Sequence, residues 1–457
     1  MAGTFPGVIA FSFMVSLILL GVGLRARIRL LQIALVPASL IAGIAGFTLI
    51  NLDLSFGFKS SDFTAFAFHF FTLSFMSLVL TGKEVDRDGG ENSSVIRGGS
   101  WLSVVWVMSL VLQGLTGIGV IILYDWVTGS ELSYFLGAIA THGFTQGPGQ
   151  ALALGSIWES ELGIQHAIDF GLIYASAGFV AAFLIGVPVA RYAISRGMNW
   201  NKAAVIDEEF LSGLTDSESN PSSGRQVTHA ANVDSLAFHL AILGLAYLLT
   251  DVYLKFAQGY ASEIQFGDVN LGLFFSHNLF FLHGLMVCLL LRSMLDRLGL
   301  GHLIDNDTQK RITGSSVDLM VVGTIMSIQF ALLATYIVPI FLTCLAISIV
   351  TAILCFGAAR SLGTFSVERA VTIFGCCTGS TGSGLLLLRI LDPDFSTPIA
   401  KELAFFNIAI IFLAFHILTM MAPILPTFSL MTICIVYTVT FLLGTALLTV
   451  ANRVKWI

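Results

Sequence analysis

Two short glycine-centred stretches decide how this chain folds: Thr145-Gln-Gly-Pro-Gly-Gln150 and Ser380-Thr-Gly-Ser-Gly384. They lie inside apolar regions, about 132 to 160 and 365 to 391, that glycine interrupts too often for an ordinary membrane-spanning helix. We expect both regions to be re-entrant hairpins, which enter the membrane and turn back. Irregular backbone is tolerated at membrane depth only where protein or a water-filled cavity supplies its hydrogen bonds. The two hairpins therefore predict a polar cavity inside the membrane.

The composition around these hairpins is that of an integral membrane protein. Of 457 residues, 56% are hydrophobic and only 11% are charged, whereas a soluble domain carries roughly 25% charged residues. A helix needs about 20 apolar residues to cross the hydrocarbon core. The sequence predicts an all-α polytopic fold with about 11 transmembrane helices, at residues 7–24, 30–50, 62–82, 100–124, 166–190, 235–255, 271–292, 316–337, 339–358, 402–424 and 427–450.

The positive charges are distributed unevenly between the two sides of this topology. All 22 lysines and arginines except Lys59 and Lys255 fall on one side of the membrane. Because short loops rich in these residues stay in the cytoplasm, we expect the N-terminus outside, the C-terminus cytoplasmic, and the protein in the cell (inner) membrane. The sequence has no nucleotide-binding motif and no metal-ligand cluster, so we expect no cofactor, no enzymatic activity and no nucleic-acid partner.

A Ser-rich acidic segment divides the chain into two halves. It has too little apolar surface to order itself, and we interpret it as a cytoplasmic linker. Five spans precede it, and this odd number places the second half upside down relative to the first, which predicts an inverted repeat. The expected organisation is a first repeat at 1–191 with hairpin 132–160, the linker at 192–233, a second repeat at 234–424 with hairpin 365–391, and an extra C-terminal helix at 425–457.

Opposed halves would bring the two hairpin tips together near the middle of the membrane. There the N-termini of half-helices favour an anion, and unwound carbonyl groups favour a coupling cation. A single small-residue run is more often a helix-packing surface, but two runs at equivalent positions favour a transport site. The expected substrate-binding residues are Thr145, Gln146, Gly147, Gly149, Gln150, Thr378, Ser380, Thr381, Gly382, Ser383 and Gly384.

Polar residues outside the tips are weaker candidates. The possible additional site residues are His142, which could titrate near physiological pH, Arg389, Asn407 and Asn278. For Gln113 we favour hydrogen bonding between helices over a place in the cavity. For Asp318, near the start of the span at 316–337, we favour a helix-capping role.

Several stretches resemble the bacterial glutamate:sodium symporter family. Leu31 to Gly43 is similar to the family's second helix, with Pro37 followed by an Ala-Gly step, and Gly186-Val-Pro-Val-Ala-Arg-Tyr192 is similar to its Gly-Gly-Pro-Val-Ala-Arg-Tyr sequence. Gln146 to Gln150 aligns with a Gly-Gly-His-Gly-Thr pattern and keeps only its Gly-x-Gly. Gly375 to Gly382 keeps three positions of the second hairpin's pattern. The likeness covers most of residues 7 to 424, and the departures lie at the tips.

The resemblance implies a homodimeric elevator-type symporter that uses sodium to import glutamate or a closely related small carboxylate. Sodium would bind near the backbone of Gly147, Gly149, Gly382 and Gly384. Two alternatives stay open. One is a proton- or sodium-coupled carrier of a different organic anion, and the other is a channel or a non-transporting membrane receptor.

Overall fold

The structure, a computed structural model, is almost entirely helical in the residues that it describes, which are 5–81, 92–202, 204, 208–215, 224–229, 231–266, 269–393 and 395–453. Lys83, Arg87 and Lys455, which entered the orientation argument, lie outside these residues, as do parts of the linker. In the first half the α-helices are α1 (Phe5–Arg27), α2 (Arg29–Ile33), α3 (Ala38–Asn51), α4 (Ser61–Leu80), α5 (Asn92–Thr128), α6 (Phe135–Phe144), α7 (Pro148–Ser160), α8 (Ala167–Ser195) and α9 (Glu208–Ser212).

The second half follows with a similar order of long and short helices. Its α-helices are α10 (Ser235–Ala261), α11 (Phe280–Arg297), α12 (Asn306–Met326), α13 (Phe330–Thr335), α14 (Ile337–Ala359), α15 (Ser366–Thr378), α16 (Thr381–Leu391), α17 (Ile399–Leu413) and α18 (Leu430–Arg453). The other elements are a strand pair, β1 (Gln265–Phe266) with β2 (Val269–Asn270), the short helices η1 (Leu271–Phe275), η2 (His277–Leu279) and η3 (Gly301–Leu303), and the irregular turns η4 (His416–Met421) and η5 (Ala422–Thr427).

Within the described residues, eight helices are long and apolar enough to cross a membrane. They are α1, α4, α5, α8, α10, the η2–α11 unit, α14 and α18. A ninth span is formed if α17 is joined to the η4–η5 segment, across a bend of 51°. These helices confirm a polytopic α-helical membrane protein. The count is lower than eleven because the spans expected at 30–50 and 316–337 are each broken.

The first break follows from a residue visible in the sequence. Pro37 has no amide hydrogen and extended backbone, so the helix stops at Ile33 and restarts at Ala38. The second expected span is divided between α12, which ends at Met326, and α13, which starts at Phe330. Helix α12 also starts ten residues earlier than expected, because the Asp305 carboxylate accepts a hydrogen bond from the Thr308 amide and caps the helix. The capping role that we expected for Asp318 is therefore wrong, since Asp318 lies in the fourth turn of α12.

The linker is more ordered than its composition suggests. Helix α8 extends to Ser195, and α9 buries Leu211 beside α1, where the Arg25 guanidinium donates to the Phe210 carbonyl. The expectation that the whole segment lacks order is wrong for these residues, because their few apolar side chains pack on a surface that only the folded protein provides.

A second contact fixes the start of the linker to the base of the α15–α16 unit. The Trp200 amide donates to Glu368, and the Asn201 side chain donates to the Asp392 carboxylate. Burial alone would raise the pKa of Asp392, but hydrogen bonds from Thr397 and Ser396 outweigh it and hold this pKa below its usual value. The chain after α8 is thus hydrogen-bonded to the start of α15 and to the end of α16.

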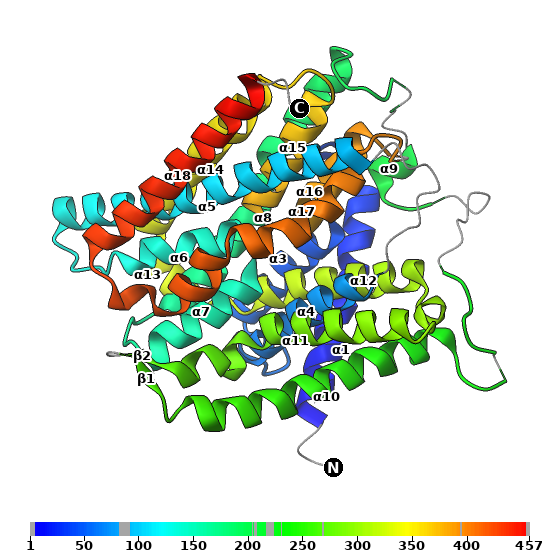
Figure 1. Ribbon diagram of the computed structural model, residues 1–457, viewed down its shortest axis with the longest axis horizontal. Helices are drawn as coiled ribbons and strands as arrows, with labels where there is room; N and C mark the ends of the chain where they lie inside the picture. Colours follow the sequence, from blue (N-terminus) through cyan, green and yellow to red (C-terminus); the bar gives the residue numbers. More distant parts are fainter. Residues whose placement is uncertain are drawn as a thin grey trace.

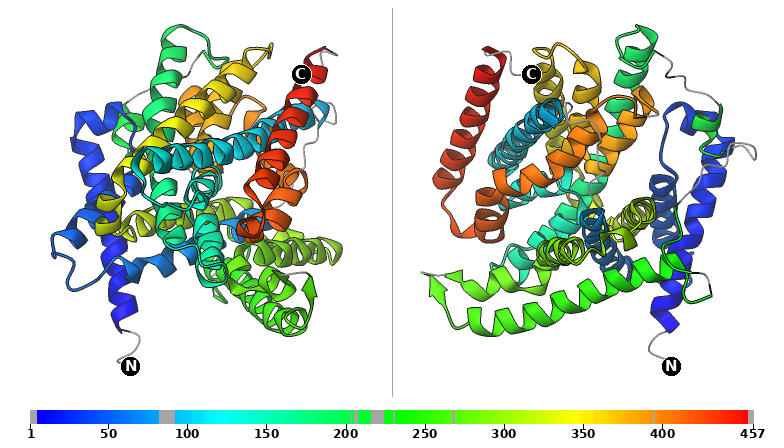
Figure 2. Two further views of the ribbon diagram at one scale, coloured as in Figure 1. Left: turned by 90° about the vertical axis from the view of Figure 1, so that its left-hand side faces the viewer. Right: turned by 45° about the vertical axis from the view of Figure 1, so that its right-hand side comes forward.

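Helices α5 and α8 form the centre of the molecule. Helix α5 packs against α6, α14, α17 and α18, whereas α8 packs against α6, α7, α15 and α16. The two interrupted helix pairs therefore share α8 as a common support. Figure 1 shows α10 along one edge of the molecule and α18 along another, and Figure 2 shows the helix pairs between the peripheral helices α1, α10 and α18.

Candidate functional site

The first interruption lies between α6 and α7. Helix α6 ends at Phe144, and α7 starts at Pro148 after Gly147, whose φ of +86° is a conformation that L side chains rarely adopt. The two helices run back along each other, since the rings of Phe135, at the start of α6, and Trp158, near the end of α7, are 6.3 Å apart. The break is therefore the tip of a folded-back pair of helices.

The second interruption lies between α15 and α16, at Gly379 and Ser380. The Ser380 backbone is fully extended there, and α16 starts at Thr381. Close packing joins the two helices, because a Cβ added to Gly375 would lie only 2.7 Å from the Gly384 Cα. Gly384, a predicted site residue, thus allows α15 and α16 to pack closely. Helix packing is the alternative explanation given above for a run of small residues.

The two tips meet around Gln113 of α5. The Thr145 hydroxyl donates to the Gln113 side-chain oxygen at 2.7 Å and to the Cys377 carbonyl at 3.2 Å. The Gln113 amide nitrogen donates to the same carbonyl at 2.8 Å and to the Thr351 hydroxyl of α14 at 2.9 Å. Gln113 is fully buried. It bonds between helices, as expected, but the helices it joins are those of both tips.

Two glycines show how closely the backbones approach. A Cβ on Gly147 would lie 3.4 Å from the Gly379 carbonyl oxygen of the other tip. A Cβ on Gly178 of α8 would lie 2.1 Å from the Thr378 carbonyl oxygen, so only glycine fits at that position. Sequence reasoning missed Gly178. The signal that could have found it is the row of small residues along one face of α8, Gly171, Ala175, Gly178 and Ala182.

Several predicted residues take specific places at these tips. Thr381 donates to the side-chain oxygen of Asn407 in α17 at 2.9 Å, which brings two candidates together. Gln146 pairs with the buried His142 one turn before it, at 2.7 Å. The Ser380 hydroxyl is buried and has no hydrogen-bond partner among the described residues. This hydroxyl is therefore free to hydrogen-bond a ligand or a water molecule.

Other predicted residues serve the local structure. Gly149 lies against the Phe71 ring of α4, which would overlap a Cβ, and the Thr378 hydroxyl donates to the Phe374 carbonyl of its own helix. Gln150 and Ser383 are buried in the first turns of α7 and α16. These positions surround the tips, and at Gly149 packing against Phe71 accounts for the small residue.

Two of the additional candidates lie away from the tips. Arg389 is in the last turn of α16, with its guanidinium over the Phe395 ring at 5.3 Å from the ring centre. It is eight residues beyond Thr381, about 12 Å along the helix. Asn278 is in η2, the short helix that leads into α11, and η2 packs against α7.

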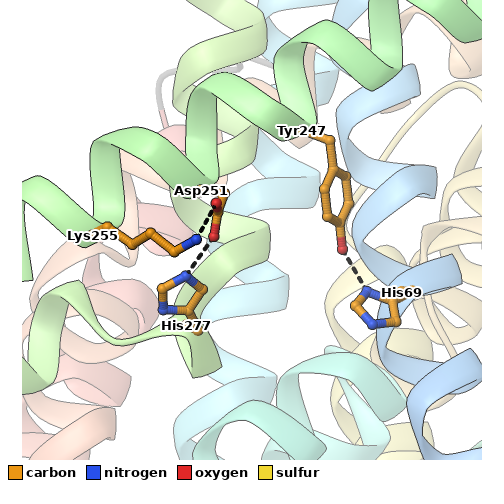
Figure 3. A network of polar contacts seen from close by, with 5 residues as sticks. All are labelled: His69, Tyr247, Asp251, Lys255 and His277. Atoms are coloured by element: carbon orange, nitrogen blue, oxygen red, sulfur yellow. Dashed lines mark hydrogen bonds and ion pairs between the residues drawn. The ribbon is translucent and has the colours of Figure 1, made fainter.

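A separate polar network lies beside Asn278, on the side of α10 that faces α4 and η2. Figure 3 shows Asp251 between Lys255 and His277, and Tyr247 pointing toward His69 of α4. Asp251 is 2.7 Å from the Lys255 ammonium and 3.0 Å from the His277 ring. The ring of His69 is hydrogen-bonded to the Tyr247 hydroxyl. The network ties α10 to neighbouring helices and does not include a tip residue.

The arrangement of helix ends at the tips gives the site its electrostatic character. Helices α7 and α16 start there and present N-termini, while α6 and α15 end there and present carbonyl groups. The first amides of a helix have no partner within the helix and carry a partial positive charge, and the last carbonyls carry a partial negative charge. One small volume therefore offers groups for an anion and groups for a cation.

A comparison with protein families gives these features a context. A family model described as sodium/glutamate symporter matches residues 5–382. The chain belongs to this family. The match confirms the family resemblance suggested by the sequence, and it covers α1 to α15 with the second tip as far as Gly382. No curated protein matches the chain.

Membership of the sodium/glutamate symporter family supports sodium-coupled symport in broad terms, with substrate and sodium as the bound species. It also implies transport rather than catalysis, and together with the apolar helices it supports an integral membrane location. The symporter's helices α16 to α18 lie almost wholly beyond the matched residues, although α16 supplies half of the second tip.

Proposed function

We propose that this protein is a sodium-coupled symporter that imports glutamate or a closely related small carboxylate, with both tips forming one binding site. The observation that carries the proposal is the direct contact between the tips, in which the Thr145 hydroxyl donates to Cys377 of the other unit. Two chain breaks 235 residues apart, buried and hydrogen-bonded to each other, are more than helix packing requires. The family match supports the coupling ion and the substrate class.

The proposed site uses the helix ends rather than a buried lysine or arginine. The substrate carboxylates bind at the N-termini of α7 and α16, with hydroxyl contacts from Ser380 and Thr381. Sodium binds among backbone carbonyls near Gly147 and Gly382. The buried Ser380 hydroxyl, which has no partner within the described residues, supports this assignment, because a bound ligand would satisfy it.

The proposed mechanism is elevator-type alternating access by a homodimer. The two hairpins, with α8 between them, move as one body across the membrane, and residues 1–191 and 234–424 form an inverted repeat. The close fit of α8 to both tips, seen at Gly178, supports joint movement of these elements. In the proposed orientation, the N-terminus is outside and the C-terminus is in the cytoplasm of the inner membrane.

Uptake of labelled glutamate by proteoliposomes tests this function. With sodium outside and none inside, we expect accumulation above equilibrium, and we expect counterflow in preloaded vesicles, because a carrier exchanges its ligand. Replacing external sodium while the proton gradient is held constant should abolish accumulation. Absence of sodium-driven uptake of glutamate and of other small carboxylates by folded protein would reject the proposal, and uptake without saturation or counterflow would indicate a channel.

Substitution of the two tip glycines is expected to give different defects. Gly147→Ala should reduce transport at least tenfold and lower stability by about 1–3 kcal/mol, because its backbone conformation strains any residue with a Cβ. Gly382→Ala should fold normally, since its Cβ would lie 3.4 Å from the Ser380 hydroxyl and 3.5 Å from Val317. Its methyl group would lie beside the first turn of α16, where a substrate carboxylate is proposed to bind, and should therefore raise the KM for glutamate.

The measurements are initial uptake rates over a range of glutamate concentrations and thermal unfolding in detergent. Gly244→Ala is the matched control, because nothing lies within 4 Å of its added Cβ in the middle of α10. If Gly382→Leu, a larger change at the same position, transports with the wild-type KM, the substrate binds elsewhere.

A further inference from the structure

Helix α12 has an exposed face that is polar although the helix lies among membrane spans. The exposed residues of its first four turns are Asp307, Lys310, Arg311, Gly314, Ser315 and Asp318. Beyond Asp318, every residue from Met320 to Met326 is buried. We call these six residues the α12 polar face. It runs from the start of the helix to Asp318, about 18 Å along the axis, and stops there.

The chemistry of this face differs from that of faces that contact lipid. The exposed large side chains of α14 are all apolar, namely Ile337, Val338, Phe341, Leu342, Leu345, Ile349 and Ile353. A charged side chain is costly in hydrocarbon, and it faces a water-filled space or the interior of the bundle instead. The α12 polar face therefore lies against water. Helices α4 and α3 pack against the other sides of α12.

The inner end of the polar face lies beside the second tip. Val317 precedes Asp318, and its Cγ1 would be 3.5 Å from a Cβ on Gly382. The Asp318 carboxylate lies near the buried Ser39, in the first turn of α3. Because Pro37 interrupts the chain just before α3, a third broken helix presents its N-terminus to this carboxylate.

We propose that Asp318 is a ligand of the coupling cation, in addition to the backbone carbonyls near Gly382, and that the α12 polar face is the water-filled route between the second tip and the cytoplasm; the inference rests on the proposed sodium-coupled symport. Hard cations such as sodium take carboxylate and hydroxyl oxygens as ligands. Asp318 and Ser39 supply both. An empty Asp318 next to the tip repels an anionic substrate, and a cation on Asp318 removes this repulsion, so that each ligand strengthens the binding of the other.

The first test is the sodium dependence of glutamate binding to the purified, full-length protein. In Asp318→Asn we expect the sodium concentration that gives half-maximal glutamate binding to rise at least tenfold, or the dependence on sodium to disappear. Ser39→Ala should give a smaller shift in the same direction. Asp307→Asn is the matched control, because it makes the same change on the same face at the outer end of the helix, and it should behave as wild type.

The outcomes separate this inference from the proposed function. If wild-type protein binds glutamate without any effect of sodium, the proposed coupling fails. If wild type depends on sodium and folded Asp318→Asn depends on it equally, Asp318 is not the cation site and the inference alone is overturned. If Asp318→Asn does not fold, Asp318→Glu replaces it. An unchanged sodium dependence of glutamate binding in this variant, whose carboxylate is displaced by one methylene, would count against Asp318 as a ligand.

A second measurement tests the water-filled route and does not depend on transport. Ser315→Cys should react with a membrane-impermeant thiol reagent, above the background of the native cysteines, and sodium with glutamate should change its rate. Ile349→Cys, on the apolar face of α14, should stay unreactive, because thiol reagents attack the thiolate, which forms in water. Equal reactivity at the two positions would mean that the α12 polar face is no such route.

Discussion

Replacement of Gln113 by leucine is expected to abolish coupled transport. Its side chain joins Thr145 of one tip to Cys377 of the other and is fully buried. Leucine fills a similar volume but removes one hydrogen-bond partner from the Thr145 hydroxyl and one from the Cys377 carbonyl, although their contact with each other remains. Loss of a buried hydrogen-bond partner costs about 1–3 kcal/mol. A cost near the upper end of this range predicts a reduction of about a hundredfold in the initial rate of glutamate uptake.

The control for this variant is Gln309→Leu. Gln309 is also a fully buried glutamine, and its side chain accepts a hydrogen bond from Ser77, far along α12 from the tips. Leucine removes this hydrogen bond together with a buried amide nitrogen that has no partner among the described residues, so the variant should lose less stability and still bind glutamate with sodium. Wild-type uptake by folded Gln113→Leu would show that contact between the tips is not required.

Removal of the buried carboxylate of Glu402 is expected to give the largest loss of stability. Arg369 of α15 makes two hydrogen bonds to Glu402 of α17, at 2.8 and 2.6 Å, and both residues are buried. In Glu402→Gln the guanidinium is left without its counter-charge, which costs about 3–5 kcal/mol. A Cβ on Gly98 of α5 would overlap the carboxylate, so the pair is enclosed and cannot relax toward solvent.

Thermal and chemical unfolding in detergent measure this effect. A pair with an exposed carboxylate, Arg292 with Asp296, gives the control, and Asp296→Asn should cost at most about 1 kcal/mol. The double variant Arg369→Met with Glu402→Met should recover much of the loss, because a buried ion pair replaced by apolar side chains of similar size is often neutral. A small effect of Glu402→Gln alone would mean that water reaches Arg369.

Local chemistry made much of the helical framework visible in the sequence. Long apolar runs gave α1, α4, α14 and α18 within about three residues, and gave α5, α8 and α10 as shorter helices than the structure has, because the membrane demands length and apolarity whatever the neighbours are. The breaks at Gly147 and Ser380 were also predictable, since glycine and proline end helices locally. The Pro37 break and the Asp305 cap had local signals too, but the apolar runs around them outweighed those signals.

The candidate site was predictable only in part. The residues that bend the backbone, Gly147 and Ser380, identify the tips. Gln113 and Gly178 do not stand out, because each is one polar or small residue on a long helix, and their importance depends on which carbonyl lies opposite. The same holds for Asp318, whose three-dimensional neighbour Ser39 is 279 residues away in the chain.

The sequence by itself determined the membrane class, the helix breaks and the family, because these depend on hydropathy, backbone conformation and short motifs that a residue carries with it. The tertiary structure alone decided that the two breaks touch, that Gln113 joins them, and that one polar face of α12 is exposed as far as Asp318. The reason is physical: hydrogen-bond partners and access to water are properties of residues brought together from distant parts of the chain.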